Sequence, residues 1–285
     1  MMETNQKEVV DYQRAEHLLQ LGRFTDAIPI IGTQLTQQPE DHYSHYQMAR
    51  AFLGLSDYDA ANQHADKVIA ADPNSSLGFF IKSVICHYQL HFTQELEYAE
   101  QAAHLDPEDP DILLRLARAQ IQSGLLKKAK VTAEQIVGLI PDDLESHEIM
   151  GDIYFELNDY EKASQHFEAA LEYDPENHTI INDLARCYIG LKERKKAIET
   201  MHQALVLAPD SDVLRSNMYQ TLQSFLDAEK LKGRSALKKL PSELQFFYRD
   251  YQQRTNVFEK FGSVFWGIVW ISLFGALIFF FSTVT

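Results

Sequence analysis

The chain is poor in cysteine and in basic residues, and each shortage argues against a class of protein: disulfide or zinc scaffolds in the first case, nucleic-acid binders in the second. Its 285 residues include only two cysteines, Cys86 and Cys187, and neither belongs to a metal-binding or redox spacing. We therefore expect two buried thiols rather than a disulfide or zinc scaffold. The 41 acidic residues outnumber the 26 basic ones and give a net charge of -15. An acidic chain without basic stripes predicts no nucleic-acid partner.

Sequence motifs for catalysis are also missing. The chain has no glycine-rich phosphate loop, no nucleophile elbow and no HExxH motif. Among the eleven histidines, His87 and His91 are spaced i, i+4, and His42 and His45 are spaced i, i+3. Neither pair has a second ligand cluster elsewhere in the sequence. We expect no enzymatic activity, no cofactor, no metal site and no small-molecule substrate.

The chain does have a strict proline period. Six prolines stand 34 residues apart, and two positions after each comes a residue whose side-chain oxygen can cap a helix. The prolines are Pro39, Pro73, Pro107, Pro141, Pro175 and Pro209, and the capping residues are Asp41, Ser75, Asp109, Asp143, Asn177 and Ser211. A proline ends one helix and the cap begins the next. The period predicts an array of helical repeats.

Within each repeat, small and large side chains alternate in a fixed order. Position 1 of the repeats is set at Glu8, His42, Ser76, Pro110, Leu144 and His178. Small residues then recur at positions 8 and 20, where two helices approach closely, and larger ones recur at positions 11 and 17. The pattern predicts two helices of about 14 residues per repeat, joined by a tight turn.

This pattern resembles the tetratricopeptide repeat over residues 8–211. The clearest copy is the fifth repeat, with Met150, Gly151, Tyr154, Tyr160, Ala163, Phe167, Ala170 and Pro175. The resemblance implies an all-α, right-handed superhelical solenoid of six helix-turn-helix repeats. Residues 1–7 are then an N-terminal tail, and 212–229 a capping helix. The packed side of that helix is expected to hold Val213, Leu214, Met218, Leu222, Phe225 and Leu226.

The third repeat departs from the pattern at position 20. It has Glu95 where a small residue is expected, together with Lys82 and Ser83 in its first helix. From these polar residues we expect a locally looser or displaced helix pair.

The resemblance further implies a concave inner surface lined by positions 2, 5, 9 and 12 of each first helix. The expected partner-binding residues are Tyr43, Tyr46, Arg50, Leu77, Phe80, Val84, His87, Arg115 and Arg118. We expect this surface to be aromatic in the second and third repeats, cationic around the arginines and acidic in the fifth repeat. It suits a partner helix or an extended acidic peptide. The alternative is that the aromatic residues only pack against neighbouring repeats.

One activity known in this family is not expected here. Some tetratricopeptide domains hold the C-terminal carboxylate of chaperones with Lys and Asn at positions 5 and 9. Position 5 reads Tyr12, Tyr46, Phe80, Leu114, Glu148 and Asn182; position 9 reads Glu16, Arg50, Val84, Arg118, Asp152 and Arg186. The required set is absent.

Residues 262–285 form a run without any charged side chain. As a helix it would be about 36 Å long, against a hydrocarbon core of about 30 Å. The run predicts a transmembrane anchor, with Trp266 and Trp270 at the interface. A buried helix of the repeat domain is disfavoured, because the run is apolar on every face.

Charge near this run predicts its orientation. Residues 230–285 hold eight basic and three acidic residues, and Arg249, Arg254 and Lys260 flank the run on one side only. The first eight residues lack a signal peptide. Both features predict a tail-anchored, single-pass protein with cytoplasmic repeats, in a bacterial inner membrane rather than on an organelle surface. Residues 230–261 are predicted to be a basic hinge and an amphipathic juxtamembrane helix, which lies on the bilayer or docks on a partner.

Together these features predict a membrane-anchored scaffold for protein–protein interaction. The leading interpretation is an accessory or assembly subunit of a membrane complex, which recruits a protein partner through the concave surface. The alternative is a free-standing, cytoplasm-facing receptor for soluble client proteins or targeting peptides.

Overall fold

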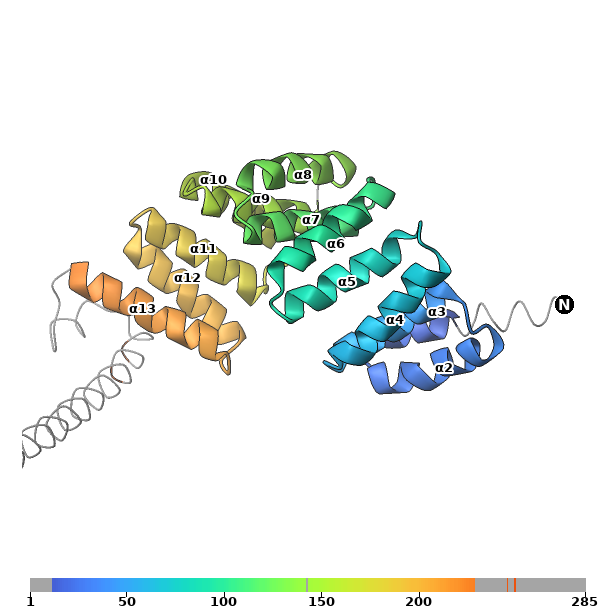
Figure 1. The fold of residues 1–285 in the computed structure, drawn as a ribbon. Helices are drawn as coiled ribbons and strands as arrows, with labels where there is room; N and C mark the ends of the chain where they lie inside the picture. Colours follow the sequence, from blue (N-terminus) through green and yellow to red (C-terminus); the bar gives the residue numbers. More distant parts are fainter. Residues whose placement is uncertain (1–11, 142, 229–244, 246–248, 250–285) are drawn as a thin grey trace, which may run out of the picture. The chain divides into compact units, whose positions relative to one another are not determined.

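Helices make up all the regular structure in the described part of the chain. The computed structural model describes residues 12–141 and 143–228, together with positions 245 and 249. Residues 12–20 are helical. The helices that follow are α2 (Phe24–Gln37), α3 (His42–Gly54), α4 (Tyr58–Ala71), α5 (Ser76–Tyr88), α6 (Phe92–Leu105), α7 (Pro110–Gln122), α8 (Leu126–Leu139), α9 (Leu144–Glu156), α10 (Tyr160–Tyr173), α11 (His178–Gly190), α12 (Arg194–Leu207) and α13 (Asp212–Ala228) (Figure 1). The prediction of two helices per 34-residue period is confirmed.

The six predicted capping residues all hold the N-terminus of a first helix. Asp41 accepts a hydrogen bond from the backbone N–H of Ser44 at 2.8 Å, and Asp109 accepts two, from Asp111 and Ile112. Ser75, Asp143, Asn177 and Ser211 accept equivalent bonds. Each bond satisfies a donor that the first turn of a helix leaves unpaired. The prediction of a cap after each proline is therefore confirmed.

The turn inside each repeat uses a left-handed residue at position 15. The six residues in this conformation are Gly22, Ser56, Leu90, Gly124, Asn158 and Lys192, with φ between 60° and 70°. The next residue then donates its N–H to the carbonyl at position 11, as His91 does to Cys86 at 2.8 Å. This closes the C-terminus of the first helix. Only Leu90 places a bulky apolar side chain at this strained position.

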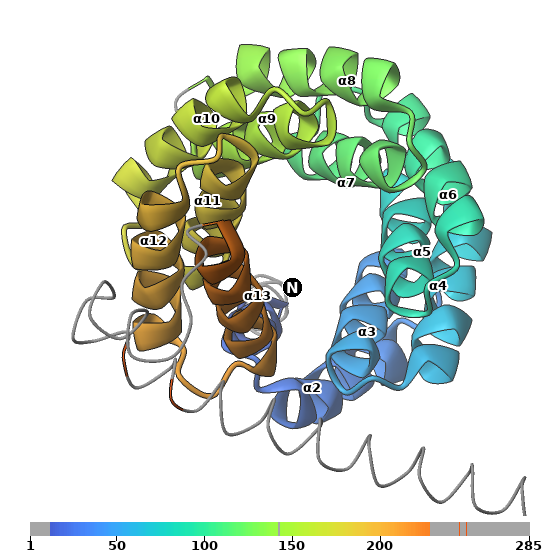
Figure 2. The same ribbon diagram turned by 90° about the vertical axis from the view of Figure 1, so that its left-hand side faces the viewer.

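The described chain divides into two compact units. The first runs to Pro175 and the second begins at Glu176. In the first unit α4, α6, α8 and α10 pack on the first helix of their own repeat, and α2, α4, α6 and α8 also pack on the first helix of the next repeat. Consecutive first helices α3, α5, α7 and α9 also contact one another, and Figure 2 shows them on the inner side of this stack, with α4, α6, α8 and α10 outside.

In the second unit α12 packs between α11 and α13. Leu214, Met218, Leu222 and Leu226 of α13 are buried. Val213, which we expected on the same side, is 67 % exposed. It precedes Leu214 by one residue, which turns it about 100° around the helix and away from the packed side.

Several predicted segments lie outside the described residues. They are the tail 1–7, the hinge and helix of 230–261 apart from positions 245 and 249, and the anchor 262–285 with Trp266 and Trp270. Among the described helices, none combines the length and the apolar character needed to cross a membrane. The right-handed superhelical course of the array stays a prediction.

Candidate functional site

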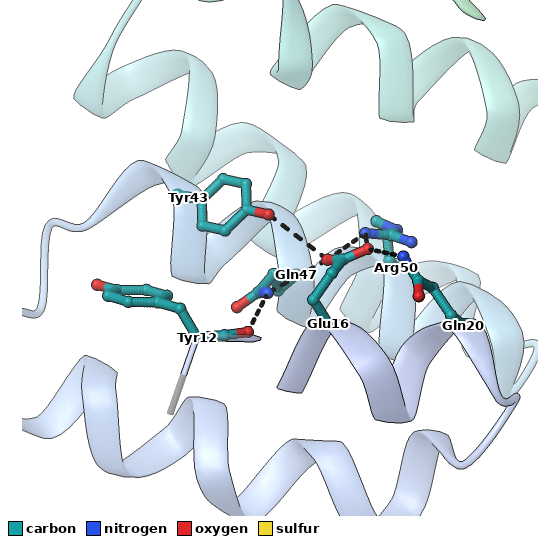
Figure 3. Close-up of polar contacts among 6 residues, drawn as sticks. All are labelled: Tyr12, Glu16, Gln20, Tyr43, Gln47 and Arg50. Atoms are coloured by element: carbon teal, nitrogen blue, oxygen red, sulfur yellow. Dashed lines mark hydrogen bonds and ion pairs between the residues drawn. The ribbon is translucent and has the colours of Figure 1, made fainter. Parts of the chain in front are cut away.

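Tyrosines and one arginine form a cluster on the inner side of the first two repeats. The rings of Tyr12 and Tyr43 lie 5.9 Å apart, and those of Tyr43 and Tyr46 lie 6.1 Å apart. The guanidinium of Arg50 lies 5.5 Å from the centre of the Tyr46 ring, a cation–π contact. Arg50 also donates to both carboxylate oxygens of Glu16, at 2.8 and 2.7 Å (Figure 3). We call these five residues the tyrosine–arginine cluster.

Burial and charge pairing shift the pKa values of the ionisable groups in this cluster. Burial raises the pKa of Tyr46 to about 12. Burial would also raise the pKa of Glu16, but the hydrogen bonds and charge of Arg50 outweigh it, so the pKa lies below its ordinary value. Gln47 adds a hydrogen bond to Glu16 at 3.3 Å and another to the backbone carbonyl of Tyr12 (Figure 3). At neutral pH the cluster thus holds an ion pair without net charge, with aromatic rings beside it.

Three predicted residues of α5 continue this side of the stack. Leu77, Phe80 and Val84 are half-buried, whereas the core of α5 is formed by other positions, such as Ile81 and Ile85. Leu77 and Phe80 occupy the same repeat positions on α5 as Tyr43 and Tyr46 occupy on α3, and both helices lie on the inner side of the stack in Figure 2. We call Tyr43, Tyr46, Leu77, Phe80 and Val84 the inner-face patch.

Glu95 is buried in a group of three polar side chains. Its exposure is 0 %, and its carboxylate pairs with the guanidinium of Arg115 from the next repeat. Nδ1 of His87 lies 3.1 Å from both carboxylate oxygens. Burial lowers the pKa of Arg115, and the charge of Glu95 opposes that shift. We call His87, Glu95 and Arg115 the buried triad after its central carboxylate, although the His87 side chain itself is 43 % exposed.

The buried triad corrects the expectation of a loose third repeat. Helices α5 and α6 pack along their length as the other pairs do. A lone buried carboxylate would be strongly destabilising, but an ion pair with further hydrogen bonds offsets the loss of hydration. Glu95 therefore fits position 20 because Arg115 reaches it from α7.

The predicted cationic zone is not present as expected. Arg50 pairs with Glu16, Arg115 pairs with Glu95, and Arg118 pairs with Glu148 at 3.2 Å. Each of these arginines is matched by one carboxylate, so the inner side of the first unit carries little net positive charge there. The Arg118 pair is the most exposed of the three on its arginine side, at 42 %, and such a pair exchanges readily with solvent or a ligand.

The structure thus groups the nine expected residues in three ways. Five form the inner-face patch, three are arginines held by carboxylates, and His87 belongs to the buried triad. Sequence reasoning missed Gln47 and the role of Glu148 as a partner of Arg118. The ion pair of Glu16 and Arg50 could have been predicted from the sequence, because these oppositely charged residues stand at position 9 of successive repeats. Partner binding by the nine residues stays a prediction.

Chemistry beyond these contacts is sparse in the described part of the chain. No group of three His, Cys, Asp or Glu side chains there could hold a metal ion. Both cysteines are buried and neither belongs to a disulfide. The inner side of the first unit thus presents mainly apolar and aromatic side chains, and its arginines Arg50, Arg115 and Arg118 are paired with carboxylates.

Sequence comparison places the repeats in a known family. Tetratricopeptide repeat models match residues 12–76, 96–153 and 154–217. The chain is 23 % identical over 185 residues to stress-induced-phosphoprotein 1 of Caenorhabditis elegans, an overlap of 53 % of this chain and 58 % of that protein. It is 24 % identical over 99 residues to the Hsp70-Hsp90 organizing protein of Triticum aestivum, covering 35 % of this chain and 17 % of that protein. The match thus spans less than two thirds of either relative.

Solved structures show the same fold. The Cut9–Hcn1 hetero-tetramer of the APC/C matches with a TM-score of 0.69 at 17 % identity, over 83 % of this chain and 44 % of that chain. PilW, a type IV pilus biogenesis factor, matches with a TM-score of 0.64 at 14 % identity, over 74 % of this chain and 98 % of that one. PilF of Pseudomonas aeruginosa gives 0.63 at 18 % identity, over 79 % and 98 %. The chain belongs to the tetratricopeptide repeat family and has the fold of a scaffold for protein–protein interaction.

Proposed function

We propose that this chain is a membrane-anchored scaffold that recruits a protein partner through the inner-face patch. The observation that carries the proposal is the half-buried state of that patch. Tyr43 and Tyr46 on α3, and Leu77, Phe80 and Val84 on α5, are neither sealed in the core nor fully exposed. Apolar side chains held in this way on adjacent helices offer area that a partner can bury.

The contacts define the kind of partner segment. Since Arg50 and Arg115 are already paired with carboxylates, apolar and aromatic contacts supply most of the binding energy. A partner helix with an apolar stripe fits this description better than an extended acidic peptide. Arg118, whose pair with Glu148 is partly exposed, then contributes at the rim of the interface.

The membrane part of the proposal rests on the sequence. The uncharged run 262–285, with Arg249, Arg254 and Lys260 on one flank, supports a single anchor and cytoplasmic repeats. Tethering confines the partner to the bilayer surface and raises its effective concentration there. In this proposal the chain is an accessory or assembly subunit of a membrane complex in a bacterial inner membrane.

The named relatives do not extend the proposal to chaperones. Two of them are named as stress-induced-phosphoprotein 1 and Hsp70-Hsp90 organizing protein. In this chain the positions of a carboxylate clamp hold Tyr46 and Phe80, and Glu16 and Arg50 there pair with each other. The inner side of these repeats therefore suits an apolar segment rather than a free carboxylate.

Affinity purification tests the function. The full chain is extracted in mild detergent beside a 1–228 truncation, and copurifying proteins are identified and quantified by mass spectrometry. Integral membrane proteins in fixed stoichiometry with the full chain alone would support the subunit proposal. The same soluble proteins with both forms would replace it by a receptor for soluble clients. No stoichiometric partner with either form would refute the scaffold.

Point variants test the surface. We expect the double variant Tyr46→Ala/Phe80→Ala to weaken partner binding at least about tenfold, because buried aromatic residues dominate interface energies. Val131→Ala on α8 is the matched control, since Val131 is 58 % exposed and lies outside the patch. Equal binding by both variants, measured on folded proteins by surface plasmon resonance, would place the interface elsewhere.

A further inference from the structure

Two histidine pairs join the two helices of the second and of the fifth repeat. Nδ1 of His45 on α3 lies 2.9 Å from Nδ1 of His64 on α4. Nδ1 of His147 on α9 lies 3.3 Å from Nδ1 of His166 on α10. In both repeats the histidines occupy positions 4 and 23, so the second pair repeats the first three periods later.

The histidines at these positions occur together or not at all. The same two positions are Phe79 and Tyr98 in the third repeat, and Leu113 and Thr132 in the fourth. An aromatic residue also stacks on the second histidine of each pair. The ring of Phe52 lies on His64 at 5.6 Å and 20°, and that of Tyr154 on His166 at 5.5 Å and 13°. The second and fifth repeats thus share one small cluster that the third and fourth lack.

The hydrogen bonds of the first pair assign its protons. Nε2 of His45 lies 2.9 Å from the backbone carbonyl of Pro39, which can only accept, so this nitrogen carries a proton. In the neutral ring Nδ1 of His45 is then the acceptor, and His64 donates from its own Nδ1. A further proton on His45 would place two N–H groups face to face. A further proton on His64 would leave a charge on a half-buried ring.

The surroundings favour the neutral form of the rings. Burial is the main cause that lowers the pKa of His64 to about 4, and His45 and Lys67 lower it further. Burial also lowers the pKa of His45, together with Lys67, while the hydrogen bond to Pro39 and the charges of Glu40 and Asp41 oppose the shift.

In the second pair, burial again lowers the pKa of the histidine on the second helix. Burial and then His147 lower the pKa of His166. The other rings around this pair are those of Tyr154 and Tyr173, which stack on His166 and on His147 respectively. The surroundings of the second pair therefore favour the neutral form of the His166 ring.

We propose that the two histidine pairs are acid-sensitive latches, which loosen α3 against α4 and α9 against α10 when the pH becomes mildly acidic. Because Tyr43, Tyr46 and Arg50 also lie on α3, loosening of the second repeat would release a partner held by the inner-face patch. This link to release rests on the proposed function, whereas the acid sensitivity of the repeats does not.

The pH window follows from the difference between the closed and the open hairpin. An exposed imidazole has a pKa near 6.5, so the open form binds more protons than the closed form between about pH 6.5 and pH 4. Stability of the hairpin is therefore lost as the pH falls through this window. For His64 alone the opening equilibrium would rise by at most about 30-fold between pH 8 and pH 5. Solvent screening of a half-buried ring reduces this to about tenfold.

Hydrogen exchange followed by mass spectrometry on the full chain tests the latches at pH 7.5 and pH 5.0, after correction for the intrinsic exchange rate. We expect the protection of peptides from α3–α4 to fall about tenfold at the lower pH, and that of peptides from α9–α10 to fall as well. Helices α7 and α8 contain no histidine and serve as the internal reference, with less than a twofold change. A pH-independent protection of α3–α4 would overturn the proposal.

A variant that copies the third repeat, His45→Phe/His64→Tyr, separates the latch from general acid effects. We expect it to abolish the acid response of α3–α4 and to leave that of α9–α10 unchanged. A response that persists in α3–α4 of the folded variant would refute the latch. If the variant does not fold, the imidazole titration of the wild-type chain by NMR decides, because a His64 pKa of 6.5 or higher would also refute it.

Partner binding is measured separately on the same proteins. Acid-dependent exchange without any release of the partner would retain the latch and contradict its link to the inner-face patch. Release at pH 5.0 that disappears in the variant would support both.

Discussion

Removal of the Glu95 side chain tests the view that the buried triad holds the third and fourth repeats together. Glu95→Ala leaves the guanidinium of Arg115, whose side chain is only 12 % exposed, without its carboxylate. Nε of Arg115 is already buried without a hydrogen-bond partner among the described residues. Breaking a buried pair from one side destabilises a protein by about 3–5 kcal/mol, and the partial access of Arg115 to water favours the lower value.

A second substitution in the same place is expected to restore stability. Position 20 of one repeat and position 6 of the next are 20 residues apart, and at two other boundaries of the first unit they are filled by alanine and isoleucine. Ala61 and Ile81 share one core cluster, and Ala129 and Ile149 share another. Glu95→Ala/Arg115→Ile copies that arrangement, so we expect it to be within about 1 kcal/mol of the wild type, or more stable.

Urea unfolding monitored by circular dichroism measures both variants. A loss of about 3 kcal/mol, over a slope of about 2 kcal/mol per molar urea, lowers the midpoint by about 1.5 M. Hydrogen exchange at α6 and α7 then shows whether the loss is local to this boundary. A shift below about 0.5 M for Glu95→Ala would refute the reasoning. So would a double variant as unstable as the single one, because the ion pair would then not be the source of the loss.

Further changes test the packing, the turn and the caps, each through the free energy of unfolding. Gly151→Ala should destabilise by about 1–3 kcal/mol, because the new Cβ would meet the ring of Phe167 at 2.6 Å. Gly138→Ala is its control, since open space surrounds that site, and a loss of stability there would contradict the argument. Leu90→Asn should stabilise by about 1 kcal/mol by relieving the left-handed backbone, and any loss would show that Leu90 makes compensating contacts. Asp109→Ala should destabilise by about 1 kcal/mol through the lost cap; no change would mean that water replaces it.

The local features of the fold could be predicted because they repeat. Helix ends follow from a proline and a cap at fixed spacing, and both depend on residues a few positions apart. The small residue at position 8 is equally readable: Gly151 stands where Phe167, sixteen residues later, fills the space that a Cβ would need. Such features need no knowledge of how the repeats stack.

The predictions that were wrong concern contacts between repeats. The sequence shows Glu95 as an anomaly, but its partner Arg115 is 20 residues away and belongs to another repeat. The expected cationic zone failed for the same reason, since the carboxylate beside Arg50 comes from the preceding repeat. The histidine pairs cannot be recognised along one helix face of the sequence, because their members are 19 residues apart and lie on the two helices of a hairpin.

The ion pair of Glu95 and Arg115 also makes the boundary between the third and fourth repeats chemically different from the other boundaries of the array. A chain of near-identical modules risks joining the wrong neighbours while it folds, because every interface resembles every other. If the fourth repeat were skipped, Glu95 would face Ile149, the residue at position 6 of the fifth repeat, and its charge would be buried against an apolar side chain. The only arginine at position 6 belongs to the fourth repeat. The pair thus favours the correct order of the repeats, because only the fourth repeat offers a cation to the buried carboxylate of the third.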